Sequence, residues 1–211
     1  ESGSYPTLSQ PNLIKWDVSQ CSDFRFMFSF ATSFNGEMFR VVDASANGGQ
    51  GLENMFFDAR SFNNGGSSSI NNWDVSGATS LELKVFTNNF ASPGGSFNQP
   101  LNNWDVSNVT DMRSIFRYSA FDQDISSWNV NALSVTGNGQ GTPITGSSGS
   151  LTLSTANYDA LLIAWDAYCY PSWPGSGMNF GNSTFSLGTA AETARTSLIA
   201  KWGGITDGGG V

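Results

Sequence analysis

The sequence predicts an α/β repeat protein: a solenoid of about five irregular coils, made of short strands and short helices, with a helical cap at its C-terminal end. Two observations predict the coils. A tetrapeptide recurs at steps of 24 to 31 residues, and a motif with two phenylalanines follows each of its first four copies. A third observation predicts the cap, because the Gly/Ser-rich residues 137–150 precede two stretches of helical periodicity.

The tetrapeptide is Trp-Asp-Val-Ser, which occurs at residues 16–19, 73–76 and 104–107, with divergent copies at 42–45 and 128–131. The second motif is an apolar residue and Phe, then a spacer, then Phe-Asn or Phe-Asp. Its copies are Phe28 with Phe34-Asn35, Phe56 with Phe62-Asn63, Phe86 with Phe97-Asn98, and Phe116 with Phe121-Asp122. Two signatures in a fixed order indicate stacked units that bury their aromatic residues against one another.

The copy at residues 104–122 shows how one coil is expected to fold. Trp104 and Val106 point inward from a short extended segment, and Asp105 points outward between them, because side chains alternate along a strand. Residues 111–120 are then expected to form a short helix with Ile115 and Phe116 on its buried face. The repeated aromatic residues are expected to be core: Trp16, Trp73, Trp104 and Trp128, and Phe28, Phe56, Phe86 and Phe116.

Residues 97–112, with the sequence Phe-Asn-Gln-Pro-Leu-Asn-Asn-Trp-Asp-Val-Ser-Asn-Val-Thr-Asp-Met, closely resemble the repeats of the BspA-like leucine-rich-repeat surface-protein family. The resemblance covers residues 13–135 by repeat and continues into residues 153–165 and 189–209, which are similar to the family's C-terminal cap. It implies a leucine-rich-repeat-like solenoid that is secreted or displayed on a cell surface, often as one module of a larger protein, with no known catalytic residues. The chain departs from the family pattern in its Gly-rich insertions, in Val42 at a Trp position and in its shortened last copy.

Three domains are expected. The repeat solenoid and its N-terminal lead-in occupy residues 1–136, a Gly/Ser-rich loop occupies 137–150, and a cap over the last coil occupies 151–211. In the cap we expect a short strand at 151–153, then a helix that Ser154 caps, with Asn157 three positions on as a poor capping-box partner. A second helix is expected at 190–202, ending at Gly203.

The composition excludes several classes of function. The net charge is −8, and no cluster of Lys or Arg is present to bind the phosphates of a nucleic acid. No stretch approaches the roughly 20 apolar residues of a membrane helix, so no membrane insertion is expected. The chain has no histidine, so it lacks a Ser-His-Asp or Cys-His pair, and no pair among its 17 acidic residues stands out as catalytic. We therefore expect no enzymatic activity.

One carboxylate recurs at the same repeat position, in Asp17, Asp43, Asp74 and Asp105. Equivalent positions of stacked coils lie about 4.8 Å apart, where two carboxylates repel each other by roughly 3.5 kcal/mol at an effective dielectric of 20. Three arrangements relieve this repulsion. Each carboxylate accepts backbone N–H groups in the following turn, the row binds calcium, or the face is solvated and screened. Calcium is thus the one cofactor that the sequence allows.

Three aromatic residues, Tyr118, Tyr170 and Trp173, are candidates for contact with a sugar or a protein partner. Cys21 and Cys169 lie 148 positions apart, a spacing that fits no disulfide framework, so both a disulfide and two separate thiols stay open.

The expected function is that of an extracellular, surface-displayed repeat module that recognises a protein or a glycan, as in adhesion. The alternative is a structural subunit that assembles with copies of itself into an extracellular filament, a surface layer or a virion shell.

Overall fold

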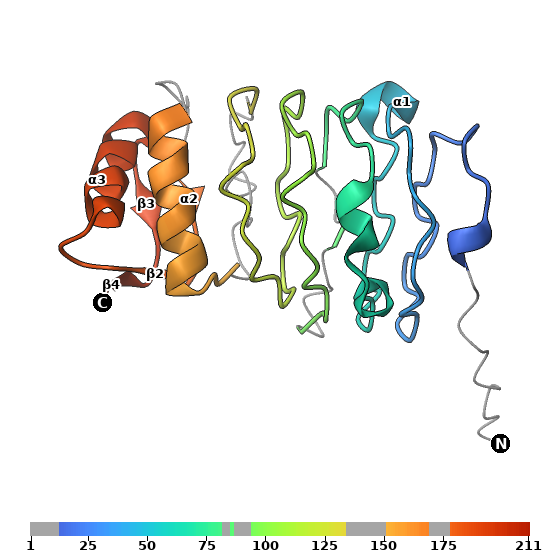
Figure 1. The fold of residues 1–211 in the computed structure, drawn as a ribbon, viewed down its shortest axis with the longest axis horizontal. Coiled ribbons are helices and arrows are strands. Elements are labelled where there is room, and N and C mark those ends of the chain that lie inside the picture. The colour runs from blue at the N-terminus through green and yellow to red at the C-terminus, as the bar shows by residue number, and fades with distance from the viewer. Residues whose placement is uncertain (1–12, 82–84, 87–93, 134–150, 169–177) are drawn as a thin grey trace, which may run out of the picture.

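The structure is a computed structural model that describes residues 13–81, 85–86, 94–133, 151–168 and 178–211. Successive coils of the chain lie side by side along its long axis, and two helices, α2 and α3, stand at the C-terminal end (Figure 1). We number the coils by their tetrapeptides: coil 1 covers residues 13–35, coil 2 covers 42–63, coil 3 covers 73–98, coil 4 covers 104–122, and coil 5 begins at 128.

Aromatic rings stack from coil to coil, and this stacking sets the register of the repeats. The rings of Phe28, Phe56, Phe86 and Phe116 follow one another with centroids 5.7, 5.8 and 6.2 Å apart. A parallel column contains Phe34, Phe62, Phe97 and Phe121, with spacings of 5.8, 6.0 and 6.2 Å. Neighbouring rings in both columns are inclined by less than 10° to each other. These spacings lie in the favourable range for aromatic pairs, so each coil is positioned by its neighbours.

The helix predicted for residues 111–120 is wrong. This segment forms consecutive turns in which the N–H groups of Ile115, Arg117 and Ser119 donate to the carbonyl groups three residues earlier. Ser114 and Tyr118 have φ angles of 63° and 58°, in the left-handed region that an α-helix does not use. We call this segment and its equivalents, residues 24–31 and 52–59, the turn ladders.

Coil 1 shows why a turn ladder replaces a helix. The N–H groups of Met27, Ser29 and Ala31 make local turns, whereas those of Phe24, Phe26, Phe28 and Phe30 donate to carbonyl groups of coil 2 at 2.7–3.0 Å. A helix directs all its internal N–H groups along its own axis. In a stack of coils, half of the N–H groups must donate to a neighbouring coil. The turn ladder leaves every second N–H group available for that purpose.

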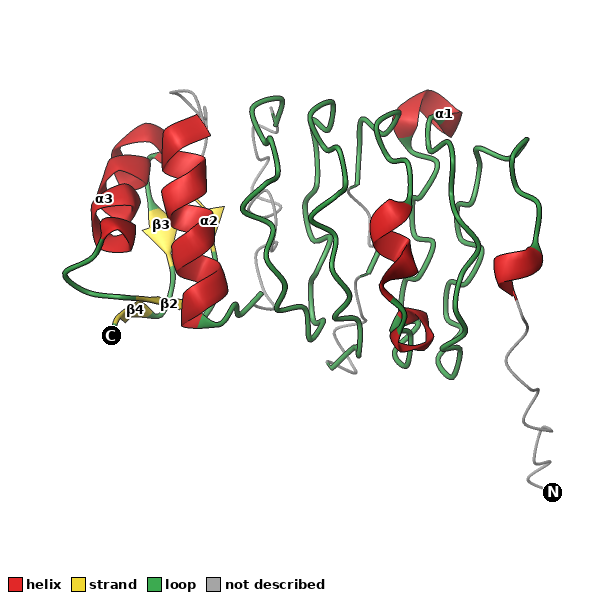
Figure 2. Ribbon diagram, viewed as in Figure 1, coloured by secondary structure: helices red, strands yellow, loops and turns green. Residues whose placement is uncertain are grey.

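The remaining elements of the coils are short. A 3-10 helix, η1, covers Leu13–Lys15, and a helical turn, α1, covers Ala46–Gly49. Two more 3-10 helices, η2 at Asn64–Gly66 and η3 at Ser68–Asn72, lie in the insertion before coil 3. The short strands expected in the coils are absent from the described part of residues 13–133, where only isolated bridges such as Ser80 with Asp111 occur (Figure 2).

The cap consists of two helices and two small parallel sheets. Helix α2 covers Thr155–Tyr168, with its buried face formed by Tyr158, Leu161, Leu162 and Trp165. Helix α3 covers Ala190–Trp202, the range that the sequence predicts; Thr189 caps its N-terminus and Gly203, at φ 79°, ends it. Strand β1 (Met178–Asn179) pairs with β3 (Ile205–Thr206), and β2 (Thr184–Phe185) pairs with β4 (Gly209–Gly210).

At the start of the cap, the predicted strand is wrong, and Asn157, the poor capping-box partner, makes a different contact. Residues 151–153 form no strand. Leu153 is buried, and its N–H donates to Oγ of Ser183 instead of to the backbone of a neighbouring strand. Asn157 does not complete a capping box with Ser154, because its amide donates to the carbonyl and the carboxylate of Asp122 in coil 4. Packing of the cap against the coils overrides the local signals.

Candidate binding surface

The tryptophan column is buried from coil 3 onward. Each of these tryptophans bonds to the backbone just before the tetrapeptide of the previous coil. Nε1 of Trp73 donates to the carbonyl oxygen of Phe39, and Nε1 of Trp104 to that of Ile70, both at 2.9 Å. Trp128 repeats the pattern with the carbonyl oxygen of Leu101. Each indole therefore buries its ring and satisfies its single donor.

Trp16 does not belong to this core, which corrects the expectation for the first tryptophan. It is 52% exposed and stacks on Phe39 with the ring centroids 6.1 Å apart. Phe28 is half-buried, whereas Phe56, Phe86 and Phe116 are buried. The difference arises because coil 1 has no described coil on its outer side.

The four repeated aspartates each accept a hydrogen bond from the backbone N–H two residues later. Oδ1 of Asp17, Asp43, Asp74 and Asp105 lies 2.8–3.1 Å from the nitrogens of Ser19, Ser45, Ser76 and Ser107. Asn129, which occupies the position in coil 5, makes the same bond with Asn131. The Asx-type arrangement that the sequence allows is therefore present in all five coils.

These bonds stabilise the charged form of the carboxylates. The hydroxyl and backbone N–H groups of the following serine lower the pKa of Asp43 and of Asp105, and the backbone N–H of Ser19, followed by its hydroxyl, lowers the pKa of Asp17. Within the described ranges, no group of three or more Asp, Glu, Cys or His side chains lies close enough to hold a metal ion. Calcium binding by the row stays an alternative to the Asx-type turns, to be decided by a chelation experiment.

Two adjoining hollows form the candidate binding surface. A hollow of about 200 Å³ is lined by Ile14, Glu37, Met38, Phe39, Arg40, Ser69 and Asn72. A second hollow, of about 280 Å³, is lined by Arg40, Asn71, Asn72, Trp73, Asp74, Val75, Asn103 and Asp105. Because Arg40 and Asn72 line both, the hollows are adjacent, and we call them together the polar trough.

The trough offers donors and acceptors held in fixed positions. Nε of Arg40 donates to the carbonyl oxygen of Asn72 at 3.0 Å, which holds the guanidinium over the trough. Oδ1 of Asn71 accepts the N–H of Asn103 at 2.9 Å, so this amide is oriented by the next coil. Asp74 and Asp105 use Oδ1 for their local turns, and their Oδ2 atoms have no partner among the described residues. Amides, carboxylates and a guanidinium in one hollow suit a ligand rich in hydroxyl or amide groups.

Of the three predicted aromatic contact residues, the structure describes Tyr118, which does not line the trough. Tyr118 lies at a left-handed position of the coil 4 turn ladder, with the guanidinium of Arg117 4.9 Å from its ring centroid. Tyr170 and Trp173 lie outside the described residues, as does Cys169. Cys21 is exposed and forms no disulfide with any described residue.

A ladder of asparagines, which sequence reasoning missed, joins the coils at the second phenylalanine column. Oδ1 of Asn35 accepts the N–H groups of Asn63 and Gly65, and Oδ1 of Asn63 accepts the N–H of Asn98. Oδ1 of Asn98 in turn accepts the N–H of Asp122. The signal was visible in the sequence, since Asn or Asp follows the second Phe of every motif.

The last rung of this ladder docks the cap. Oδ1 of Asp122 accepts the N–H of Ser154 at 2.7 Å and the amide of Asn157 at 2.9 Å, at the N-terminus of α2. A carboxylate there is favoured by the partial positive charge of the helix N-terminus. The change from Asn to Asp thus marks the junction between coils and cap.

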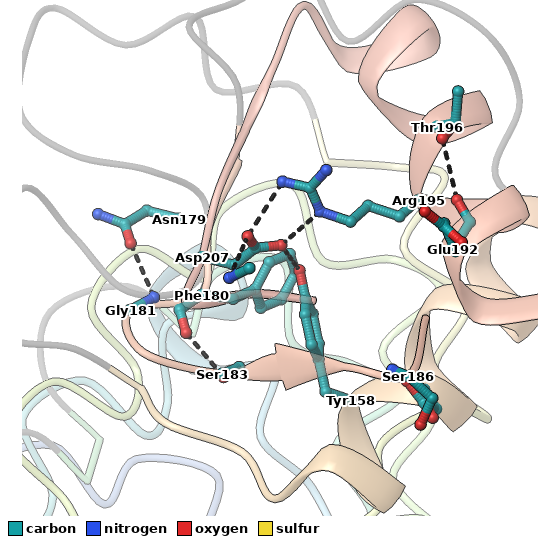
Figure 3. Close-up of polar contacts among 12 residues, drawn as sticks. Tyr158, Asn179, Phe180, Gly181, Ser183, Ser186, Glu192, Arg195, Thr196 and Asp207 are labelled. Atoms are coloured by element: carbon teal, nitrogen blue, oxygen red, sulfur yellow. Dashed lines mark hydrogen bonds and ion pairs between the residues drawn. The ribbon is translucent and has the colours of Figure 1, made fainter. Parts of the chain in front are cut away.

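A buried polar cluster ties the C-terminal tail to both cap helices (Figure 3). Oδ2 of Asp207 accepts hydrogen bonds from the hydroxyl of Tyr158 and Nε of Arg195, both at 2.7 Å, and its side chain is only 2% exposed. Burial, together with the hydrogen bond to Asp207, raises the pKa of Tyr158. Each charged group has a partner, and neither hollow of the trough reaches the cluster, so it serves as a structural junction.

No described helix combines the length and the apolar character needed to cross a lipid bilayer. Residues 5–65 and 50–138 match the model of a protein family described as "Mycoplasma protein of unknown function, DUF285". No curated protein and no solved structure matches the chain.

Proposed function

The chain belongs to the family described as Mycoplasma protein of unknown function, DUF285, and on that premise we propose that it is a recognition module that binds a protein or glycan in the polar trough. The observation that carries the proposal is the trough itself, because it spans the coils that the aromatic columns hold in register. Repeat proteins commonly bind extended ligands on such multi-coil surfaces.

The proposal includes the fold class and the setting. We propose that the stacked coils are a leucine-rich-repeat-like solenoid of the BspA-like type, acting outside the cell without enzymatic activity. The Trp-Asp-Val-Ser repeats and the coil-to-coil stacking support this relation. The family match is consistent with it, since the matched segments contain all five copies of the tetrapeptide.

The test is a screen of glycan and peptide arrays with the purified chain, followed by Arg40→Ala. Arg40 is exposed, and its one side-chain bond among the described residues is to the carbonyl of Asn72, so the variant is expected to fold. We expect Arg40→Ala to weaken binding of any hit by about tenfold or more, the equivalent of one charge-assisted hydrogen bond. The matched control, Arg117→Ala, removes an arginine outside the trough. Equal losses in both variants, or none in Arg40→Ala, would refute the site.

A second candidate function is that of a self-assembling structural subunit. It is favoured by large apolar side chains that coil 1 exposes, among them Trp16 at 52%, Phe26 at 55% and Phe30 at 60%. Size-exclusion chromatography with light scattering over a range of concentrations tests it. A monomer at the highest soluble concentration rules out assembly through this surface.

A further inference from the structure

The second hollow of the polar trough lies within the stack of coils. Its lining comes from Arg40 just before coil 2, from residues 71–75 at the start of coil 3, and from Asn103 and Asp105 at the start of coil 4. Coil 1 precedes these segments and coil 5 follows them, so described parts of the chain flank the hollow on both sides. The groups that line it can therefore be read as a site for a ligand.

The guanidinium of Arg40 is the positive group of this hollow, and it has no carboxylate partner among the described residues. Its Nε donates to the carbonyl oxygen of Asn72, and no bond of its Nη atoms occurs within the described ranges, although Asp74 and Asp105 line the same hollow. Five other basic side chains form ion pairs of 2.6–2.9 Å with carboxylates: Arg25, Arg60, Arg113, Arg195 and Lys201. The two Nη atoms of Arg40 thus offer a fork of N–H donors, which matches the two oxygens of one carboxylate.

The other end of the hollow requires a neutral ligand. The Oδ2 atoms of Asp74 and Asp105 have no partner among the described residues, and a charged carboxylate only accepts hydrogen bonds. Hydroxyl and amide N–H groups supply the donors that these oxygens need. A second anionic group placed there would be repelled by both carboxylates. The hollow therefore selects a ligand with one negative charge at the Arg40 end and neutral donors beyond it.

The apolar residues of the hollow offer no anchor for a peptide side chain. Trp73 and Val75 are 3% and 1% exposed. The ring of Trp73 stacks between those of Phe56 and Trp104, with centroids 6.3 and 6.2 Å away, so both of its faces are covered. Protein partners draw most of their affinity from aromatic or apolar anchors that fill pockets. A hollow of exposed amides, carboxylates and a guanidinium favours a ligand rich in hydroxyl groups instead.

We propose that this hollow binds a glycan that presents one sugar carboxylate to Arg40 and neutral sugars, with hydroxyl or N-acetyl groups, to Asp74 and Asp105. The inference rests on the proposed function and specifies the chemical class of its ligand. It separates three kinds of glycan. A neutral glycan lacks the partner for the guanidinium, a uniform polyuronate places anions against the two aspartates, and a glycan with isolated acidic sugars satisfies both ends.

The experiment measures binding of three trisaccharides to the full chain by isothermal titration calorimetry. The first has glucuronic acid between two N-acetylglucosamine units. The second is the same compound with its carboxyl group reduced to an alcohol, and the third is trigalacturonate. We expect the first to bind at least about tenfold more tightly than either of the others, the difference that one charge-assisted contact gives.

Two kinds of variant assign the difference to its groups. Arg40→Ala is expected to bind the acidic and the reduced trisaccharide equally, within about twofold, whereas Arg117→Ala keeps the preference. Asp74→Asn and Asp105→Asn retain their turns, because Asn129 makes the same backbone bond in coil 5. Combined in one chain, these two substitutions are expected to raise the affinity for trigalacturonate about tenfold, since they remove the repulsion.

The outcomes separate this inference from the proposed function. If the unmodified chain binds the acidic and reduced trisaccharides equally, and Arg40→Ala weakens both, the trough binds glycans but the inference is wrong. A preference that persists in Arg40→Ala also overturns it, since the carboxylate then binds elsewhere. Absence of binding by all three compounds overturns the inference as well, whereas the proposed function is then decided by the glycan and peptide arrays.

Discussion

Replacing Asn63 with Ala isolates the contribution of the asparagine ladder to stability. Oδ1 of Asn63 accepts the N–H of Asn98 at 2.8 Å and Nε2 of Gln99 at 3.1 Å. Alanine removes both bonds, worth about 1 kcal/mol each, and leaves the part-buried N–H of Asn98 without its acceptor. We expect the free energy of unfolding to fall by about 2–3 kcal/mol and Tm to fall by about 4–12 °C.

Two further variants make the measurement specific. Asn63→Asp keeps an oxygen in the same place, as Asp122 does on the last rung, so we expect it to cost less than about 1 kcal/mol. Asn102→Ala removes an exposed asparagine outside the ladder and is expected to change stability by no more than about 0.5 kcal/mol. Urea denaturation followed by tryptophan fluorescence provides the values. Equal losses for Asn63→Ala and Asn63→Asp would refute the hydrogen-bond explanation.

Three other outcomes are expected. Trp104→Phe lowers the free energy of unfolding by about 1–2 kcal/mol, because it removes the buried hydrogen bond from Nε1 to the carbonyl oxygen of Ile70. In the same denaturation assay, Trp16→Phe changes the free energy of unfolding by no more than about 0.5 kcal/mol, because Trp16 is exposed. Folding lowers the pKa of Asp17, Asp43 and Asp105, so these three carboxylates stabilise the fold above pH 3.8 and lose that contribution as the pH falls below it. Acid titration of Tm measures this loss, and EDTA at neutral pH is expected to leave Tm unchanged. Asn47, exposed before a glycine, deamidates faster than Asn64, whose buried amide is held by three hydrogen bonds, as peptide mapping after alkaline incubation will show.

Each of these outcomes has a clear contrary result. Equal losses in the two tryptophan variants would mean that ring volume, not the indole bond, sets the cost. A Tm that rises on acidification below pH 3.8 would contradict the sign of the pKa shifts, and a Tm lowered by EDTA would show that a divalent cation supports the carboxylate row. Faster deamidation at Asn64 would mean that the loop opens more readily than its hydrogen bonds indicate.

The polar trough shows why a binding surface is harder to predict than a repeat. Arg40 and Asn72 belong to neither repeated motif, and they meet only because the segment just before coil 2 lies beside the insertion that precedes coil 3. The carboxylates of Asp74 and Asp105 were visible as repeated residues, but their place in a common hollow was not. The prediction for Tyr118 rests on residue type alone, and the structure places this residue in the turn ladder of coil 4, outside the trough.

The sequence by itself determined which residues are equivalent. The repeated tetrapeptide and the Phe-Asn motif show that Phe56 is equivalent to Phe86 and that Asn63 is equivalent to Asn98. The spacing of apolar residues likewise predicts α3. These signals depend only on the order of residues along the chain. The tertiary structure decided how residues 111–120 fold. Local periodicity favours a helix there, but the neighbouring coil accepts alternate N–H groups, and the hydrogen bonds gained between coils replace those that a helix would make within itself.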